Sequence, residues 1–345
     1  MARRDKGEAR AIAPKKHLLG LLSKGAILLL IVLPAWSWGT IAILFASPGP
    51  KWLQLCLAVV FAALLPAIFL SSRSFYRAVP LSLIPLVLLL LWWQTLQPSG
   101  DKEWAADVAR VAHGEISGSR LTMHNVRNFR YTSEDDFNEV WEVREYDLEK
   151  LQGLDLFLSY WASEHIAHVI MSWDFGHDEH LAISIETRKD VSQEYSALKG
   201  FFKQFELAYV AGDERDLIRL RTNFRRERVY AYRLNVTPER ARALLEDYLL
   251  QMNSLTESPQ FYDALTRNCT TAIHLHTRAI NPDDPLPFDW RILVSGHLDH
   301  LLHERKIVAN GDLPFATLRQ RSRVDLRMQE HGNEGFSEIL RDGLP

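Results

Sequence analysis

The chain of 345 residues is 47% hydrophobic, and its formal net charge of -3 and pI near 6.5 give no reason to expect nucleic acid as a partner. A chain of this length suits two or three structural units. Almost all of the long apolar runs lie before residue 98, whereas most acidic residues lie after residue 100. The composition therefore indicates an apolar N-terminal segment joined to a polar domain.

Residues 1–98 contain three apolar runs, at 25–46, 52–70 and 79–96. They have about the length that crosses a hydrocarbon core of roughly 30 Å. A signal peptide or a buried core helix is the alternative for any one run. Three runs in succession, without a small-residue cleavage site after the first, argue against that alternative. We therefore expect a membrane anchor of about three transmembrane helices.

Basic residues predict the orientation of this anchor. Residues 3–16 contain six of them, and the loop between the second and third runs contains Arg73 and Arg77, whereas the first loop contains only Lys51. The positive-inside rule then places the N-terminus and the second loop in the cytoplasm. With three crossings, the rest of the chain lies outside. We expect a multi-pass protein of the bacterial inner membrane whose main domain is periplasmic.

Residues 99–310 are predicted to form this exported domain. The first elements expected are a helix over residues 102–111 and strands over residues 115–122, 126–131 and 154–160. A hairpin follows, with strand 168–175, turn 176–179 and the alternating strand 181–187. This hairpin projects His168 and Glu186 from a sheet, and whether they share a face depends on the strand register.

Helices dominate the last part of the domain. Strands are expected over residues 205–210, 217–221 and 229–234, before a helix that begins at Pro238 with Thr237 as its cap. A second helix is expected over residues 269–280, with Asn268 as its cap, and a third over residues 292–304. Residues 311–345 are predicted to be a charged C-terminal tail. The fold class expected for residues 99–310 is α+β.

Cys269 is the only cysteine outside the apolar runs, because Cys56 falls within the second of them and cannot pair with it. In the first turn of its helix, Cys269 meets free backbone N–H groups and the positive end of the helix dipole, which lower a thiol pKa. An unpaired thiol in an oxidising compartment requires an explanation, and a reactive nucleophile is one. The alternative is a small buried hydrophobic residue.

Two other polar patterns favour ordinary structural roles. Histidines recur at spacing three in His297, His300 and His303, which suits zinc, but without an HExxH or CxxC motif a solvated helix face is favoured. We therefore expect no metal and no cofactor. The charged residues between 214 and 221 are interpreted as a surface network, consisting of Glu214, Arg215, Asp216, Arg219 and Arg221.

Several short motifs occur in one order along the domain. They are His168 at the start of a strand, Ser184-Ile185-Glu186-Thr187-Arg188, Gly200-Phe201-Phe202, Asp213-Glu214-Arg215-Asp216, and Asn268-Cys269-Thr270-Thr271. Together they resemble the Lnb N-terminal periplasmic domain family of bacterial membrane proteins, over roughly residues 126–280. One departure is Asp263, where the family is expected to have Asn.

This resemblance implies a circularly permuted NlpC/P60-like, papain-like fold with an antiparallel sheet, in which the histidine strand precedes the cysteine helix. The Asn-Cys pair is also similar to lecithin-retinol acyltransferase-type proteins, which form a cysteine thioester with acyl groups from phospholipid. The family implies a thiol acyltransferase. Its expected partners are membrane phospholipid as donor and a lipoprotein amine as acceptor.

The catalytic residues expected on this basis are Cys269 as nucleophile, His168 as its base, and Glu186 as the group that orients the imidazole. Ser184 is the less favoured orienting group. His165, three residues before the strand, competes with His168 as the base.

Residues at the helix start are expected to support the reaction. Asn268 and backbone N–H groups would stabilise the oxyanion, with Thr270 beside them. Two other classes of function remain as alternatives. One is a cysteine peptidase or amidase acting on cell-wall peptides, and the other is a non-catalytic envelope module that keeps the fold.

Overall fold

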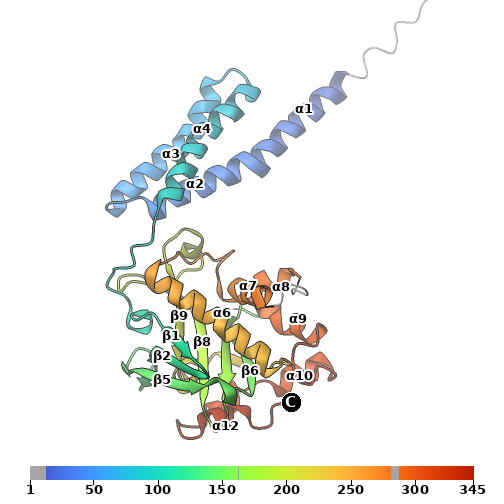
Figure 1. Cartoon of the computed structure of the whole chain (residues 1–345). Coiled ribbons are helices and arrows are strands. Elements are labelled where there is room, and N and C mark those ends of the chain that lie inside the picture. The colour runs from blue at the N-terminus through green and yellow to red at the C-terminus, as the bar shows by residue number, and fades with distance from the viewer. Residues whose placement is uncertain (1–12, 162, 281–286) are drawn as a thin grey trace, which may run out of the picture. The chain divides into compact units, whose positions relative to one another are not determined.

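The computed structural model describes residues 13–161, 163–280 and 287–345 (Figure 1). The chain divides after Gln97 into two compact units, and each is described by itself. Most of the basic N-terminal tail lies outside the described residues.

The first unit consists of apolar helices. They are α1 (Ala13–Ile27), a π-helical turn (Leu28–Val32), α2 (Leu33–Ala46), α3 (Lys51–Ser71) and α4 (Phe75–Thr95). In the described part of the chain, three helical stretches are long and apolar enough to cross a membrane, and they are Gly20–Ala46, Lys51–Ser71 and Phe75–Thr95. The prediction of three apolar helices is confirmed.

Aromatic and small residues hold these helices together. Trp36 of α2 stacks on Phe61 of α3 with ring centroids 4.4 Å apart. Gly39 allows the close approach, because a Cβ there would lie 2.8 Å from the Leu89 side chain. Outward-facing side chains such as Leu30 and Leu70 are 76% and 88% exposed. Apolar surface of this kind is expected of helices that face lipid.

The second unit is built on a sheet that, among the described residues, contains eight strands in the order β1-β2-β9-β8-β7-β6-β10, with β5 paired to β2. The fold class is α+β, as predicted. The sheet is mixed rather than purely antiparallel, because β2 and β9 pair in parallel where Arg127 lies opposite Gly212. The strands are β1 (His113–Ser117), β2 (Arg120–Arg127), β5 (Trp141–Asp147), β6 (Gly153–Tyr160), β7 (His168–Asp174), β8 (His180–Arg188), β9 (Glu206–Gly212) and β10 (Arg228–Arg233), with a small separate pair, β3 (Arg130–Tyr131) and β4 (Phe137–Asn138).

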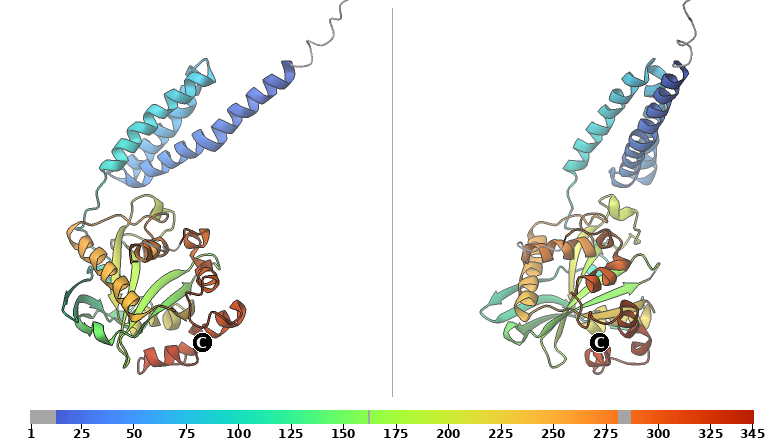
Figure 2. Two further views of the ribbon diagram at one scale, coloured as in Figure 1. Left: turned by 45° about the vertical axis from the view of Figure 1, so that its right-hand side comes forward. Right: turned by 90° about the vertical axis from the view of Figure 1, so that its right-hand side faces the viewer.

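Helices cover both faces of this sheet (Figures 1 and 2). On one face, Trp173 of β7 packs edge-on against Tyr248 of α6, and its indole N–H donates to the Ala241 carbonyl at 2.8 Å. On the other face, Ile170 shares a buried cluster with Phe336 of α12. The helices of this unit are α5 (Glu214–Leu217), α6 (Pro238–Glu257), α7 (Cys269–Ile280), α8 (Trp290–Leu293), α9 (Leu298–Glu304), α10 (Phe315–Arg321), α11 (Asp325–Met328) and α12 (Phe336–Arg341).

Three predicted elements are wrong in detail. The helix expected over residues 102–111 is only a 3-10 turn at Ala106–Val108. This segment bonds instead to the connection between β8 and β9, where the Ala105 N–H donates a hydrogen bond to the Lys189 carbonyl. The strand expected over residues 217–221 is helical, since Asp213 caps α5. The first hairpin turns at Gly118, whose φ of +65° suits glycine, rather than between the strands predicted over residues 115–122 and 126–131.

Residues 311–345, set apart in sequence as a charged tail, pack onto the second unit. Phe336 and Leu340 of α12 are fully buried. Arg341 forms ion pairs with Glu214 and Asp155, each at 2.7 Å. The charge of this segment thus includes a half-buried cation, Arg341, whose ion pairs fasten the C-terminal helix to the rest of the unit.

Candidate active site

Helix α7 begins at Cys269, and Asn268 caps it. The Asn268 side-chain oxygen accepts hydrogen bonds from the backbone N–H groups of Thr270 and Thr271, at 2.9 and 2.8 Å. A cap of this kind contributes about 1 kcal/mol to helix stability. The sequence prediction of a capped helix with the thiol in its first turn is confirmed.

The Cys269 thiol hydrogen-bonds the imidazole of His168, the first residue of β7. Burial raises the pKa of Cys269, but the hydrogen bond and the charge of His168 outweigh this effect and lower it. Burial lowers the pKa of His168, but the Glu186 carboxylate more than offsets this and raises it to about 9. Both directions favour a thiolate and an imidazolium at neutral pH.

Glu186 and Ser184 of β8 both contact the Nε2 atom of His168. The carboxylate Oε1 lies 3.0 Å from Nε2 and the Ser184 hydroxyl 2.6 Å from it. Ser184 donates its own proton to Glu186 at 2.6 Å, so it accepts from His168. These contacts engage Nε2, and they leave Nδ1 as the ring nitrogen not used by β8.

Strand register brings these residues together. In the β7–β8 pair, Ile170 lies opposite Ser184, and the same register continued by two residues sets His168 opposite Glu186. Side chains two residues apart on a strand share a face, so Ser184 and Glu186 both lie on the side of His168. The residues predicted as nucleophile, base and orienting group therefore meet at one place.

Arg221 lies behind this cluster and was missed by the sequence reasoning. It is 8% exposed, and it contacts Glu186 and Glu227, each at 3.2 Å. Glu227 also accepts a hydrogen bond from Ser159 of β6. The Arg221 guanidinium thus fixes the position of the Glu186 carboxylate, and this carboxylate in turn contacts the imidazole of His168.

The interpretation of residues 214–221 as a surface network is wrong for most of its members. Glu214, Asp216 and Arg221 are 1%, 0% and 8% exposed. Asp216 pairs with the buried Arg127, whose guanidinium donates to both of its carboxylate oxygens. The charged groups are buried as matched pairs, which sequence alone does not distinguish from a solvated run.

Two of the residues expected to support the reaction have roles at the helix start. The Asn268 oxygen is used by the cap, and its amide nitrogen donates to the Ala264 carbonyl at 2.7 Å. Thr270 is buried, with its hydroxyl 3.8 Å from the Cys269 sulfur. Within the described ranges, the backbone N–H of Cys269 has no hydrogen-bond partner. That N–H is the donor best placed to receive an oxyanion formed at the thiol.

His276 fixes the other end of α7. Its Nδ1 lies 2.6 Å from the Asp247 carboxylate of α6, and its Nε2 lies 2.7 Å from the Tyr209 hydroxyl of β9. The ring is 4% exposed and packs against Tyr248, with centroids 4.1 Å apart. This buried network holds α7 against the sheet and so fixes where Cys269 lies.

The competing histidine, His165, lies elsewhere. Its Nδ1 is 2.9 Å from Nε2 of the His297 ring, so this nitrogen contacts another histidine. His303 bonds the Leu313 carbonyl at 2.8 Å. Among the residues that the structure describes, no group of three or more His, Cys, Asp or Glu side chains is arranged to hold a metal ion.

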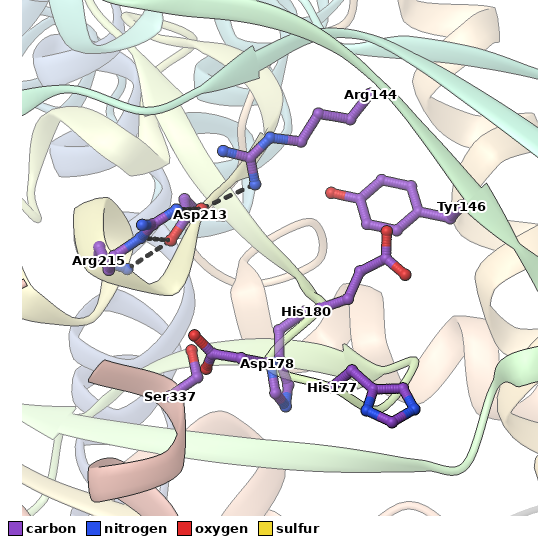
Figure 3. A pocket seen from close by; sticks show the side chains of 9 residues that line it. Arg144, Tyr146, His177, Asp178, His180, Asp213, Arg215 and Ser337 are labelled. Atoms are coloured by element: carbon purple, nitrogen blue, oxygen red, sulfur yellow. Dashed lines mark hydrogen bonds and ion pairs between the residues drawn. The ribbon is translucent and has the colours of Figure 1, made fainter. Parts of the chain in front are cut away.

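A cavity of about 280 Å³ lies at the opposite end of the β7–β8 hairpin, beside its turn (Figure 3). Arg144 and Arg215 converge there on Asp213, at 2.8 and 2.7 Å. Burial raises the pKa of Asp213, but the two guanidinium groups outweigh it and lower it to about 2. The cavity has no thiol among its lining residues, and its Arg144, Arg215 and Asp213 are paired with one another.

These features define a class of protein. An apolar helical anchor precedes an α+β domain, and that domain places a thiol at a helix N-terminus beside a histidine and a carboxylate on neighbouring strands. Residues 137–296 match the family model described as the Lnb N-terminal periplasmic domain, which confirms the resemblance seen in the sequence. This likeness to the Lnb N-terminal periplasmic domain family covers slightly less than half of the chain. Neither the curated proteins nor the solved structures gave a match to the chain.

Proposed function

We propose that this protein is a membrane-anchored periplasmic thiol acyltransferase that moves an acyl group from phospholipid, through a Cys269 thioester, to the amine of a lipoprotein. The observation that carries the proposal is the hydrogen-bonded Cys269–His168 pair, with Glu186 3.0 Å from the far side of the imidazole. Thiolate, imidazolium and carboxylate are the groups that acyl transfer through a cysteine requires.

In the first half-reaction, the Cys269 thiolate attacks the ester carbonyl of a phospholipid. Negative charge collects on the carbonyl oxygen, where the Cys269 N–H at the start of α7 stabilises it. The carbon–oxygen ester bond then breaks. His168 gives its Nδ1 proton to the departing alkoxide, so a lysophospholipid leaves and the acyl group remains on sulfur.

In the second half-reaction, an amine attacks the thioester carbonyl. His168 is now neutral and accepts a proton from the amine as the new carbon–nitrogen bond forms. The carbon–sulfur bond breaks and the Cys269 thiolate returns, paired again with an imidazolium. Glu186 and Ser184 keep the ring oriented throughout, since both contact its Nε2.

A lipid donor is favoured by the anchor. Three helices able to cross a membrane precede the domain, and a tether of this kind raises the effective concentration of a bilayer substrate. A peptidase of soluble cell-wall peptides gives no reason for such an anchor. We place the N-terminus in the cytoplasm and the domain at the periplasmic face of the inner membrane, since the basic residues predict that orientation.

Intact-protein mass spectrometry tests the proposal. The full chain is incubated in phospholipid vesicles at neutral pH, and an adduct with the mass of an acyl group, removed by hydroxylamine, is sought on Cys269. The adduct is expected in the wild type and is expected to be absent from His168→Gln. The matched control is His180→Gln, which removes the buried histidine at the other end of the hairpin and should leave the adduct intact.

An amine acceptor completes the test. Addition of a synthetic diacylglyceryl peptide with a free α-amino group should discharge the adduct and yield an N-acylated peptide. If the folded thiol reacts with iodoacetamide but never gains an acyl group, lipid acyl transfer is wrong. Cleavage of cell-wall stem peptides under the same conditions would then support the hydrolase alternative, and no reaction with either substrate would support the non-catalytic one.

A further inference from the structure

Exposed apolar side chains gather beside the thiol. Tyr195, Leu198 and Phe201 of the connection between β8 and β9 are 51%, 52% and 43% exposed, and Leu265, just before α7, is 52% exposed. We call these four residues the apolar rim. Tyr195 lies close enough to Cys269 that the thiolate charge raises its pKa, after the larger effect of burial.

Backbone contacts join the two segments of the apolar rim. The Ala264 N–H donates to the Gly200 carbonyl at 3.0 Å, and the Tyr262 N–H to the Phe205 carbonyl at 3.0 Å. The rim is therefore one surface formed by residues 195–201 and 264–265. Figures 1 and 2 show the connection between β8 and β9, together with α7, at one end of the domain and α12 at the other.

The chain enters the domain at this same end. The backbone N–H groups of Ser99 and Gly100 donate to the Glu206 carboxylate, at 2.9 and 3.1 Å. Glu206 is 2% exposed and pairs with Phe261 through a β-bridge, four residues before Leu265. Ser99 and Gly100 are thus tied to the strand that leads out of the rim.

The tether is short. The last apolar helix ends at Thr95, and four residue steps separate it from Ser99, a reach of at most about 14 Å. If that helix crosses the bilayer, the lipid surface lies within this distance of Ser99. Exposed apolar side chains so near a lipid surface would be partly withdrawn from water by contact with it.

We propose that the apolar rim docks into the interface of the bilayer leaflet in which α4 ends, and that this contact seats Cys269 beside lipid ester groups. The partner that covers the apolar rim is thus the membrane surface. The docking does not depend on acyl transfer, because a lipid hydrolase at the same thiol would be seated in the same way.

Depth-dependent quenching of a fluorescent label tests this docking. In the full chain carrying Cys56→Ser and Cys269→Ser, a single cysteine is placed by Leu198→Cys and labelled with an environment-sensitive nitrobenzoxadiazole dye. The protein is reconstituted in phosphatidylethanolamine and phosphatidylglycerol vesicles with spin-labelled lipid. The matched control is Leu326→Cys on α11, where the leucine is 59% exposed. The neighbouring residues Val324 and Met328 share a buried cluster with Phe336 of α12, so this position lies on the α12 side of the domain.

Lipid spin labels are expected to quench the dye at position 198 several-fold more than at position 326. Equal quenching at the two positions would overturn the proposal. So would a dye at position 198 that is shielded from aqueous iodide but unaffected by spin-labelled lipid, because protein would then cover the rim.

A second variant connects docking to the thiol. Leu198→Glu with Phe201→Glu should leave iodoacetamide labelling of Cys269 in detergent unchanged, which shows that the site is intact. The same variant should lower vesicle quenching of a dye at Leu265→Cys, in the cysteine-free background, to the level of the Leu326→Cys control. Undiminished quenching would contradict the assignment of the rim as the docking surface. Neither readout requires acyl transfer, so failure of the proposed function would be seen separately.

Discussion

The two ends of the β7–β8 hairpin carry similar residues and differ in chemistry. At one end His168 lies 3.0 Å from Glu186, and at the other His180 lies 3.5 Å from Asp174. Both histidines are 8% exposed. Only His168 has a thiol beside it, supplied by the first residue of α7.

This difference shows what makes a buried histidine and carboxylate useful. A cavity lies at the turn end, yet its Arg144 and Arg215 are already paired with Asp213. At the thiol end, α7 supplies the nucleophile and a Cys269 N–H that has no partner among the described residues, β7 supplies His168 and β8 supplies Glu186. The proposed chemistry therefore follows the arrangement of reactive groups and not the cavity beside the turn.

The largest expected effect is at Cys269 itself. Cys269→Ser should reduce acyl transfer by at least about a thousandfold, because the serine hydroxyl is not ionised by His168. The measurement is N-acylated peptide formed in vesicles. Cys56→Ser, which removes the other free cysteine, should retain wild-type activity. Equal losses in the two variants would show that the thiol at the helix start has no special role.

His168→Gln comes next. Loss of the imidazole should lower the rate by roughly a hundredfold to ten-thousandfold, the usual contribution of general acid–base catalysis. His180→Gln changes a histidine of equal burial at the turn end and should leave the rate within about twofold. If circular dichroism shows both variants to be folded and His180→Gln lowers the rate more than His168→Gln does, the proposed role of His168 is contradicted.

A smaller effect is expected from the groups behind His168. Glu186→Gln removes a charge-assisted hydrogen bond worth about 1.5–3 kcal/mol, or roughly a 10- to 100-fold loss of rate. It should also lower the pKa of His168, because the carboxylate is what raises it against burial. Imidazole titration followed by NMR would show this shift. An unchanged titration would mean that Glu186 is only structural.

The smallest effect on rate is expected at the turn end. Asp213→Asn should leave acyl transfer unchanged but should remove stability of about 1–2 kcal/mol at neutral pH. The sign follows from the pKa of Asp213, which is lowered to about 2 in the folded state. The contribution is present above its ordinary pKa of about 4 and is lost as pH falls toward 2. Thermal melting of both proteins should therefore converge in acid, and a constant difference would contradict this account.

Local patterns predicted much of the fold. The alternation of residues 181–187 and the β-branched and aromatic residues of 168–175 correspond to β8 and β7, and Thr237 caps α6 as expected. Each of these patterns is local, because it involves residues only a few positions apart in the sequence. The short helices α10 to α12 have no such signal, because their burial depends on distant partners such as the ion pair between Arg341 and Glu214.

The candidate site was predictable only in part. Cys269 and Asn268 are adjacent, so capping and dipole arguments apply to them directly. The meeting of His168 with Glu186 depends on a strand register that the sequence left open. Arg221 was hidden because residues 217–221 resemble a strand but form α5 and a π-helical turn, which brings the guanidinium inward.

The most direct test of the central claim is the pH dependence of Cys269 alkylation by iodoacetamide in the full chain. An ordinary thiol titrates near about 8.5. The account predicts a midpoint below this value in the wild type, since His168 stabilises the thiolate, and a higher midpoint in His168→Gln, where the lowering effect of the imidazole on the thiol pKa is lost. A wild-type midpoint at or above the ordinary value, or one that His168→Gln leaves unchanged, would show that Cys269 is a buried thiol rather than a nucleophile.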